Sequence, residues 1–389
     1  MVAYLDNAAS GPLHPAAAAA MWPWLGERFG NPSGSHQVAR AARAAVDDAR
    51  DEIAALLGIE PGGVTFTSGG TESDNLAVLG VVGARPGPVV VSAIEHPAVL
   101  AAAEASGREV RVAPVTAAGV LDLDALGPLL DATVSLVSVQ LVNNETGAVQ
   151  PLADAARLVR RRAPRALVHT DAVQAAAWMD LASAAAAADL VSISGHKLGG
   201  PQGVGALGAR AGVPALRPVL HGGGQERELR SGTHNVAGIV GLGAAAAALA
   251  RERAGTAERV AGLRDRLAAG LRRSVPGIVE TCASVRRAPG HLHVRVPGVE
   301  GEVLVALLDE AGVCASSGAA CASGATEPSP VLLAMGVPKE EAQSGLRLSL
   351  GAATTEEDVE HALRAVPAAV ARLRGRRAVP GRRPVPGEG

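Results

Sequence analysis

An amine and a carboxylate follow two neighbouring apolar segments in the middle of the chain. Lys197 closes the segment 189–197, which reads DLVSISGHK, and Asp171 ends an earlier apolar run over 166–171. A lysine amine can hold an aldehyde as a Schiff base, and a carboxylate can keep a pyridine nitrogen protonated. A lysine is usually a solvated surface residue, but this chain has only two lysines, Lys197 and Lys339. The scarcity of lysine and the preceding Ser194-Gly195-His196 therefore favour a site for pyridoxal 5'-phosphate.

Short β-rich runs alternate with helical segments through the middle of the chain. The runs cover 64–68, 89–94, 135–142, 166–171 and 189–194. This alternation predicts an α/β fold with a mainly parallel central sheet flanked by helices, in which ligands bind beyond the carboxyl ends of the strands. Five polar residues occur at or just after these ends: Thr71, His96, Asn144, Asp171 and Lys197. Their convergence on one edge of the sheet is the strongest prediction that follows from the residues alone.

A glycine turn precedes a predicted helix at Gly69-Gly70-Thr71. We expect Thr71 to cap this helix and the free backbone N–H groups to bind a phosphate. Caps of this kind also begin many helices that bind nothing, so this segment alone is weak evidence. Ser194 and His196, just before the lysine, are expected to add donors to the same phosphate.

Asp171, Gln174 and His96 are the residues expected around the cofactor ring. Asp171 is predicted to hold the pyridine nitrogen, and Gln174 is placed to reach the phenolic oxygen. His96 is placed to stack on the ring or to move protons, although a lone histidine after a strand is often structural.

The last third of the chain predicts a second, smaller α+β domain. Charged helical sequence begins near residue 250, and strand-like segments occur at 291–296 and 344–350. Arg347 lies inside the second segment, where a substrate carboxylate and a structural carboxylate are equally good partners. The small-residue stretch 314–327 predicts a mobile loop that carries Cys321, either a reactive thiol or an incidental one. Cys314 is a candidate relay or a core residue.

Composition narrows the class of protein. The 389 residues are 48% hydrophobic and 19% charged, and the net charge is -2, which argues against DNA as the main partner. No apolar run approaches the roughly 20 residues of a membrane span, so a cytoplasmic location is expected. Three cysteines without a Cys-x-x-Cys pair predict neither a disulfide framework nor a metal site.

Ten motifs in order make the chain resemble the cysteine desulfurases of the class V aminotransferase family, which are fold type I pyridoxal phosphate enzymes. The resemblance spans about residues 4–374, and its loop form resembles the housekeeping branch that supplies iron-sulfur clusters and thiolated RNA. The motifs are YLDN (4–7), FGNP (29–32), TSGGTESDN (67–75), EH (95–96), VNNE (142–145), HTDAVQ (169–174), SGHK (194–197), HGGG (221–224), RSGT (230–233) and SSGAAC (316–321).

The resemblance implies that L-cysteine is converted to L-alanine and that its sulfur is left on Cys321 as a persulfide. Lys197 is then the Schiff-base lysine and the base, His96 assists proton transfer, and Asn144 and Arg347 orient the substrate carboxylate. Alternatives within the same fold are a selenocysteine lyase or another class V aminotransferase-like enzyme in which Cys321 is incidental.

Further residues and partners follow from the same resemblance. By this resemblance the phosphate is bound by Gly70, Thr71, Ser194 and His196. The neighbouring subunit of a homodimer contributes Thr233 to the same site. The implied large domain covers 13–250, and the small domain combines 1–12 with 251–374. Residues 375–389 form a basic, proline-rich tail that is expected to be disordered. Because of this tail, the identity of the protein that accepts the sulfur is left open between an iron-sulfur scaffold and a thiolation protein.

Overall fold

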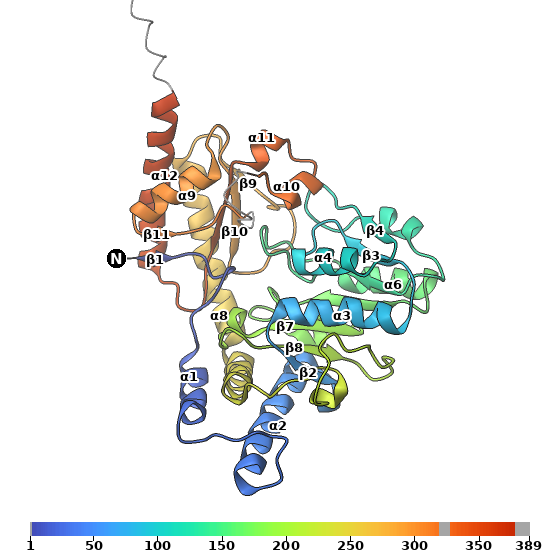
Figure 1. The fold of residues 1–389 in the computed structure, drawn as a ribbon. Helices are drawn as coiled ribbons and strands as arrows, with labels where there is room; N and C mark the ends of the chain where they lie inside the picture. Colours follow the sequence, from blue (N-terminus) through green and yellow to red (C-terminus); the bar gives the residue numbers. More distant parts are fainter. Residues whose placement is uncertain (1, 319–326, 378–389) are drawn as a thin grey trace, which may run out of the picture.

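A seven-stranded sheet forms the larger part of the computed structural model, which describes residues 2–318 and 327–377 (Figure 1). The strand order is β2-β8-β7-β6-β5-β3-β4, and β8 is the one strand of this sheet that runs in the direction opposite to the other six. The predicted mainly parallel sheet is therefore confirmed. The strands are β2 (Val64–Thr67), β3 (Val89–Ser92), β4 (Val110–Ala113), β5 (Leu136–Ser138), β6 (Leu167–Asp171), β7 (Leu190–Ser194) and β8 (Gly205–Ala209).

Alternating side chains of these strands enter two separate cores. Val89 and Val91 of β3 pack into one apolar cluster, whereas Val90 between them packs into the other. This division follows from the two-residue period of a strand, and helices cover both faces because each face is apolar. The helices of this part are α1 (Pro15–Met21), α2 (Gln37–Leu57), α3 (Gly70–Ala84), α4 (Pro97–Ala105), α5 (Leu123–Leu126), α6 (Leu152–Arg162) and α7 (Leu181–Ala184).

A smaller α+β layer forms beside this sheet and has its own apolar core. Its antiparallel sheet has the order β12-β10-β9, and β1 from the N-terminus pairs with β11 in parallel. Ala3 and Leu5 therefore share a core with residues far along the chain, such as Leu348. The elements are β1 (Ala3–Tyr4), β9 (Val279–Glu280), β10 (His291–Arg295), β11 (Val313–Cys314), β12 (Gly345–Ser349), α9 (Gly301–Glu310), α10 (Pro330–Ala334), α11 (Lys339–Ala342) and α12 (Glu356–Arg377).

One long helix, α8 (Val236–Ser274), belongs to both parts of the molecule (Figure 1). Its first half contributes Ile239 and Leu242 to the core of the large sheet, and its second half contributes Leu263 and Leu267 to the core of the smaller layer. Because 39 residues continue without interruption, the helix crosses the predicted domain boundary at 250. The boundaries 13–250 and 251–374 stay a prediction.

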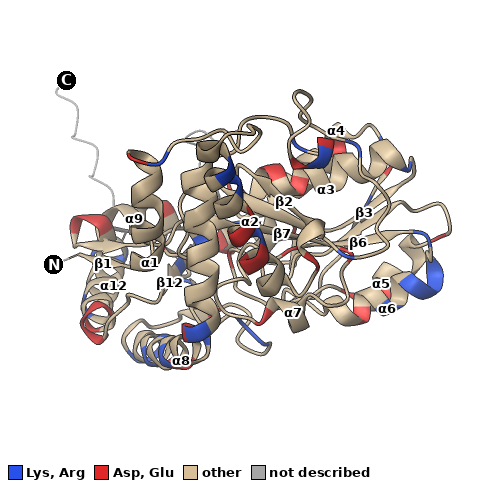
Figure 2. Ribbon diagram, turned by 90° about the horizontal axis from the view of Figure 1, so that it is seen from below, with Lys and Arg blue, Asp and Glu red and all other residues tan. Residues whose placement is uncertain are grey.

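The C-terminal helix continues past the point at which the tail was expected to begin. α12 ends at Arg377, and the rest of the predicted tail lies outside the described residues. Basic and acidic residues are spread over the ribbon, with a basic cluster in the last turn of α6 (Figure 2). No helix in the described segments is long and apolar enough to cross a membrane.

Candidate functional site

A cavity of about 300 Å³ lies beyond the carboxyl ends of β3, β5, β6 and β7, and we call it the central cavity. These strands were predicted to deliver the polar residues to this edge, and the structure brings most of them together. The sequence-predicted residues that line the cavity are His96, Asn144, Asp171, Gln174, Lys197 and Arg347. Segments from both halves of the chain therefore form one site.

The Lys197 amine is held by the N-terminal segment of the chain. Its Nζ donates to the carbonyl oxygens of Ala8 and Ala9, at 2.5 Å from the latter. Burial, followed by the positive charge of Arg347, lowers the pKa of Lys197 from 10.5 to about 8. These partners could not be predicted from the sequence, because backbone carbonyls have no sequence signature.

Asp171 ends β6 and is buried beside the amine-bearing segment. One carboxylate oxygen, Oδ1, accepts from the Val173 N–H at 2.8 Å. Burial raises the pKa of Asp171, and nearby positive charge from His96 and Lys197 opposes that rise. His96 caps α4, because its Nδ1 accepts from the Ala98 N–H at 3.1 Å. Burial lowers the pKa of His96.

A buried polar layer lies behind Asp171, and sequence reasoning did not assign it a role. His169 is fully buried between the hydroxyls of Ser138 and Ser192, each 2.9 Å from a ring nitrogen. Its Nε2 is 3.6 Å from Asp74 Oδ1, an oxygen with no hydrogen-bond partner. His169 could have been found from the sequence, because residues two apart on a strand share a face.

Carboxylates in this layer do not all favour the charged form. Burial, followed by the charge of Asp171, raises the pKa of Asp74 well above its usual value. Burial also raises the pKa of Glu95 to about 8, although the Gln140 N–H donates to it at 2.7 Å. One oxygen or nitrogen from each of Asp74, His96 and Asp171 lies within 4.8 Å of the others. We infer that Asp171 carries the negative charge, because positive charge at His96 and Lys197 opposes the rise of its pKa, whereas the charges that act on Asp74 and Glu95 are negative.

A second cavity, of about 330 Å³, lies at the N-terminus of α3, and we call it the glycine-turn cavity. It shares Ala9 with the central cavity, so the two adjoin. The four residues predicted to bind phosphate all line it: Gly70, Thr71, Ser194 and His196. Glu72, the acid on its wall, is neutralised by Arg230 at 2.8 Å. Backbone donors and hydroxyls thus face a small polar space.

The prediction that Thr71 caps α3 is wrong. The cap is Gly69, whose carbonyl accepts from the Ser73 N–H at 3.1 Å, and Thr71 is an exposed residue inside the first turn. Gly69 has a φ of 154°, which L-residues rarely adopt, so the chain turns one residue earlier than the threonine pattern suggests. The backbone of the turn still faces the glycine-turn cavity.

Replacing Gly69 with alanine should destabilise the protein through backbone strain. Only a Ser194 oxygen, 3.8 Å away, would meet the added Cβ, so strain rather than collision is the cause. We expect a loss of about 1–3 kcal/mol in the free energy of unfolding, measured by urea titration. Gly62→Ala is the matched control, because its Cβ meets nothing within 4 Å and its φ is ordinary. Equal stability of the two variants would contradict the assignment.

Arg347 pairs with a structural carboxylate, which was one of the two partners expected from the sequence. Its Nη2 donates to Asp6 at 2.8 Å and its Nη1 donates to the Asn144 carbonyl at 2.9 Å. The third donor, Nε, is buried without a partner. The guanidinium therefore links the N-terminal segment to the loop after β5 while it also lines the central cavity.

Other predicted residues lie in different surroundings. Gln174 donates to the Ala8 carbonyl at 2.8 Å rather than projecting freely into the cavity. Thr233 is exposed and is absent from the walls of both cavities as described. Cys314 pairs with Tyr4 across β11 and β1 and is half-buried. Cys321 lies outside the described residues, which stop at Gly318 and resume at Glu327.

Comparison with known proteins identifies the family. The family model described as aminotransferase class-V matches residues 3–362. The chain belongs to the class V aminotransferase family. A cysteine desulfurase of Gluconacetobacter diazotrophicus is 42% identical to this family member over 95% of this chain and 94% of its own length. An IscS-like cysteine desulfurase of Mycobacterium tuberculosis is 41% identical over 96% and 97%.

Solved structures of similar proteins agree with the fold. One, titled a NifS-like protein, superposes with a TM-score of 0.89 at 35% identity and covers 96% of this chain and all of its own. Another, titled SspA in complex with cysteine, has a TM-score of 0.77 at 31% identity and covers 89% of this chain and 98% of its own. The fold type I architecture expected from the sequence is therefore confirmed.

Proposed function

We propose that this chain is a pyridoxal phosphate-dependent cysteine desulfurase that converts L-cysteine to L-alanine. The carrying observation is that the Lys197 amine and the Asp171 carboxylate line one cavity at the ends of neighbouring strands. Relatives named cysteine desulfurases and a neighbour whose title describes a complex with cysteine support the substrate. In this reaction the Cβ–S bond of the substrate breaks, an S–S bond forms on Cys321, and the thiol protons end on alanine and the persulfide.

The chain's residues fit the cofactor. When bound, pyridoxal phosphate supplies an aldehyde for an amine and a ring that accepts electrons. Lys197 would hold the aldehyde, Asp171 the ring nitrogen and the α3 N-terminus the phosphate, since helix N-termini attract anions. Gly70 suits this position, because a Cβ there would approach the Val173 side chain to 2.8 Å and push the turn away. Asn144, Gln174 and His96 complete the wall of the cavity.

Lys197 and Arg347 would act directly on the substrate. The Lys197 amine, with its pKa near 8, can take a proton from the substrate Cα at neutral pH and return it later. His96, whose pKa is lowered by burial, is suited to pass a proton in its neutral form. The Arg347 guanidinium, which lines the central cavity beside Asn144, is the cation placed to bind a substrate carboxylate. Cys321 would receive the sulfur as a thiolate.

The low pKa of Lys197 predicts how cofactor loading depends on pH. Only the neutral amine attacks an aldehyde, so the loading rate should follow the deprotonated fraction of Lys197. With a pKa of about 8, the rate at which the cofactor-free protein binds pyridoxal phosphate should rise about tenfold from pH 7 to 9 and then level off. Stopped-flow absorbance measures this rate. A rate that climbs steadily beyond pH 10 would indicate an unperturbed lysine.

Product analysis tests the proposed function. Holoenzyme supplied with L-cysteine and a thiol reductant should form alanine and sulfide in equal amounts, and without reductant it should stop after about one alanine per chain. L-selenocysteine is assayed in parallel, because selenium leaves without help from a thiol. Absence of alanine from L-cysteine, with alanine formed from L-selenocysteine, would replace the proposal with the lyase alternative.

We further propose a homodimer in which Thr233 of the partner subunit reaches the glycine-turn cavity. Exposed Trp22, Leu25 and Phe29 give one segment a large apolar surface, which is typical of a protein interface. Sedimentation should therefore give twice the chain mass of 38.9 kDa. A species of single-chain mass at micromolar concentration would contradict the dimer. We propose a cytoplasmic enzyme that hands sulfur to a protein acceptor of iron-sulfur assembly or thiolation.

A further inference from the structure

Two described parts of the chain flank residues 319–326, which include Cys321, and both approach the same side chain. Gly318 is the last described residue before this segment and Ser329 is the third residue after it, and we call them the two roots. The Ser329 hydroxyl donates to Glu145 Oε2 at 2.5 Å. A Cβ added at Gly318 would lie 3.5 Å from the same oxygen. The chain therefore leaves Glu145 at one root and returns to it at the other.

The backbone of Glu145 is fixed beside the residues expected to bind the substrate. Glu145 lies in the loop after β5, where its N–H donates to the side-chain oxygen of Asn143 at 3.1 Å. The next residue along, Asn144, lines the central cavity, and its carbonyl accepts from Arg347 Nη1 at 2.9 Å. Glu145 thus connects the two roots to the wall of the central cavity.

The first root forms part of that wall. Ser316 and Gly318 both line the central cavity. Ser316 and Arg347 exchange two backbone hydrogen bonds, of 3.2 and 2.7 Å, so the chain before the root is attached to β12. A Cβ at Gly318 would also lie 3.3 Å from the buried Nε2 of His293, so the backbone passes closely between two side chains. The segment that includes Cys321 therefore begins at the cavity in which the substrate would bind.

An acid is a costly residue at the position of Glu145. The residue is 4% exposed, and burial raises its pKa to about 7, although the Ser329 hydrogen bond and the positive charge of Arg347 oppose the rise. One hydrogen bond offsets only part of the cost of burying an acid, so stability alone would favour an apolar residue here. The acid therefore indicates a role for the contact beyond stability of the fold.

We propose that Glu145 is a positioning residue that holds both roots of the 319–326 segment at the wall of the central cavity, and thereby favours transfer of the substrate sulfur to Cys321. Glu145 is not among the residues described as lining the cavity, so it acts through the roots rather than on the substrate. This inference rests on the proposed function, because it concerns the step in which Cys321 receives the sulfur.

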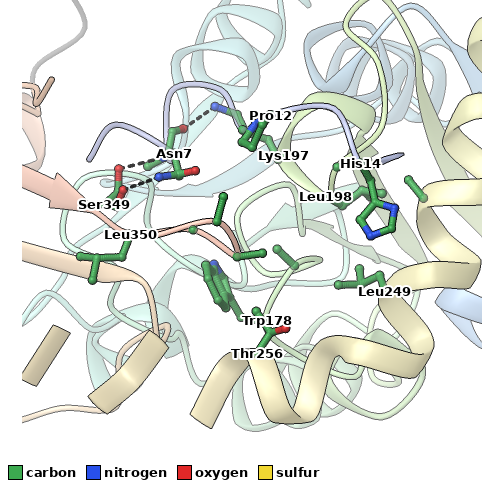
Figure 3. Close-up of a pocket in the computed structure, with 18 of the residues that line it drawn as sticks. Asn7, Pro12, His14, Trp178, Lys197, Leu198, Leu249, Thr256, Ser349 and Leu350 are labelled. Carbon is green, nitrogen blue, oxygen red and sulfur yellow. Dashed lines mark hydrogen bonds between the residues drawn. The ribbon is translucent and has the colours of Figure 1, made fainter. Parts of the chain in front are cut away.

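Separate contacts fix the part of the site that would hold the cofactor. Lys197 donates to the Ala8 carbonyl, and Asn7 Nδ2 donates to the Ser349 carbonyl at 2.9 Å, which ties the N-terminal segment to β12 (Figure 3). These contacts do not depend on the two roots. Loss of the Glu145 carboxylate should therefore slow sulfur transfer and leave cofactor content unchanged.

Comparison of L-cysteine with L-selenocysteine tests the proposal in the holoenzyme, because selenium leaves without help from a thiol. Glu145→Ala should form alanine from L-cysteine at least about tenfold more slowly than wild type, while its rate with L-selenocysteine stays within about twofold. Glu145→Gln keeps an oxygen that can accept from Ser329, so it should recover most of the rate with L-cysteine. Ser329→Ala removes the same hydrogen bond, so the double variant with Glu145→Ala should be no slower than the slower single variant.

Hydrogen exchange examines the roots without any turnover. The amides of Gly318 and Leu332 donate to the hydroxyls of Ser316 and Ser329, each at 3.1 Å. In Glu145→Ala holoenzyme these two amides should exchange at least about fivefold faster than in wild type, because the roots are no longer held. Amides of β6 should exchange at the wild-type rate.

Ser135→Ala is the matched control for Ser329→Ala. It also removes a buried serine hydrogen bond, which Ser135 donates to the Arg85 carbonyl at 2.6 Å, but it lies at the opposite end of β5 from the central cavity. This variant should change neither the exchange at the roots nor the ratio of the rates with the two amino acids.

Two results would overturn the inference. Unchanged exchange at both roots in Glu145→Ala would show that the carboxylate does not hold them, and equal slowing with both amino acids would assign Glu145 a general structural role. If Glu145→Ala fails to fold, Ser329→Ala decides by the same two measurements. A wild type that forms no alanine from L-cysteine would overturn the proposed function, whereas unchanged exchange beside normal wild-type turnover would overturn the inference alone, so the two failures are distinguishable.

Discussion

Lys197→Ala should lower alanine formation by at least about 10⁴-fold, because one substitution removes both the covalent attachment and the base. The variant should also release pyridoxal phosphate on dialysis and lack the absorbance band of the lysine-bound cofactor. Added methylamine should restore part of the activity, since a free amine can occupy the vacated space. The fold should survive, because the Lys197 amine contacts only two backbone carbonyls in the described residues.

Lys339→Ala is the matched control for this substitution. Lys339 is the only other lysine, it is exposed at the start of α11, and it is not among the residues described as lining the central or the glycine-turn cavity. It should keep wild-type activity and wild-type cofactor content. Comparable loss in both variants would mean that Lys197 has no special role in the chemistry.

Cys321→Ala should lower alanine formation from L-cysteine by on the order of 10³-fold or more, since it removes the group that accepts the sulfur. Cofactor content and the absorbance change on adding L-cysteine should persist, because Asp171, Lys197 and Arg347 are untouched. Mass spectrometry of the tryptic peptide should show no persulfide. The control Cys314→Ala should behave as wild type, since that thiol is tied into β11.

Alanine formed equally by wild type and Cys321→Ala would contradict a role for the thiol. The enzyme would then be an aminotransferase-like lyase, as the second alternative from the sequence holds. Loss of activity in both cysteine variants would instead make Cys314 part of a sulfur relay.

The sequence predicted the site best where local pattern determines position. Two apolar runs end in Asp171 and in Ser194-Gly195-His196-Lys197. Parallel strands end at the same edge of a sheet, so these residues were expected to lie together, and the structure places Asp171 and Lys197 in one cavity. β8 was missed because Gly205–Ala209 reads GALGA, which lacks the β-branched residues typical of strands.

Long-range contacts account for most of what the sequence could not predict. The carbonyls of Ala8 and Ala9 reach Lys197 across almost 190 residues of chain, and Asp6 reaches Arg347 across a still longer separation. The Thr71 cap failed for a local reason, because only the backbone of Gly69 reveals where the turn occurs. The contact between Asp74 and His169 could not be predicted, because it forms only where α3 packs against β6.

The buried layer also explains why Asp171 is suited to hold the ring nitrogen of the cofactor. Burial raises the pKa of all three acids, but only at Asp171 does nearby positive charge oppose the rise, so protons on Asp74 and Glu95 would leave Asp171 as the charged carboxylate. His169, whose pKa burial lowers to about 3, stays neutral between two serines and keeps positive charge away from the back of Asp171. The charge of Asp171 is thus directed toward the cavity rather than into the core.

Borohydride trapping tests the central claim, that Lys197 holds the cofactor, most directly. Reduction of the holoenzyme should fix pyridoxal phosphate irreversibly to its amine, and peptide mapping by mass spectrometry then reports which amine carries it. Because Lys197 and Lys339 are the only lysines, the result is close to binary. The account predicts about one cofactor per chain on the Lys197 peptide. Cofactor on the Lys339 peptide, or none fixed in a protein that retains its cofactor before reduction, would contradict it.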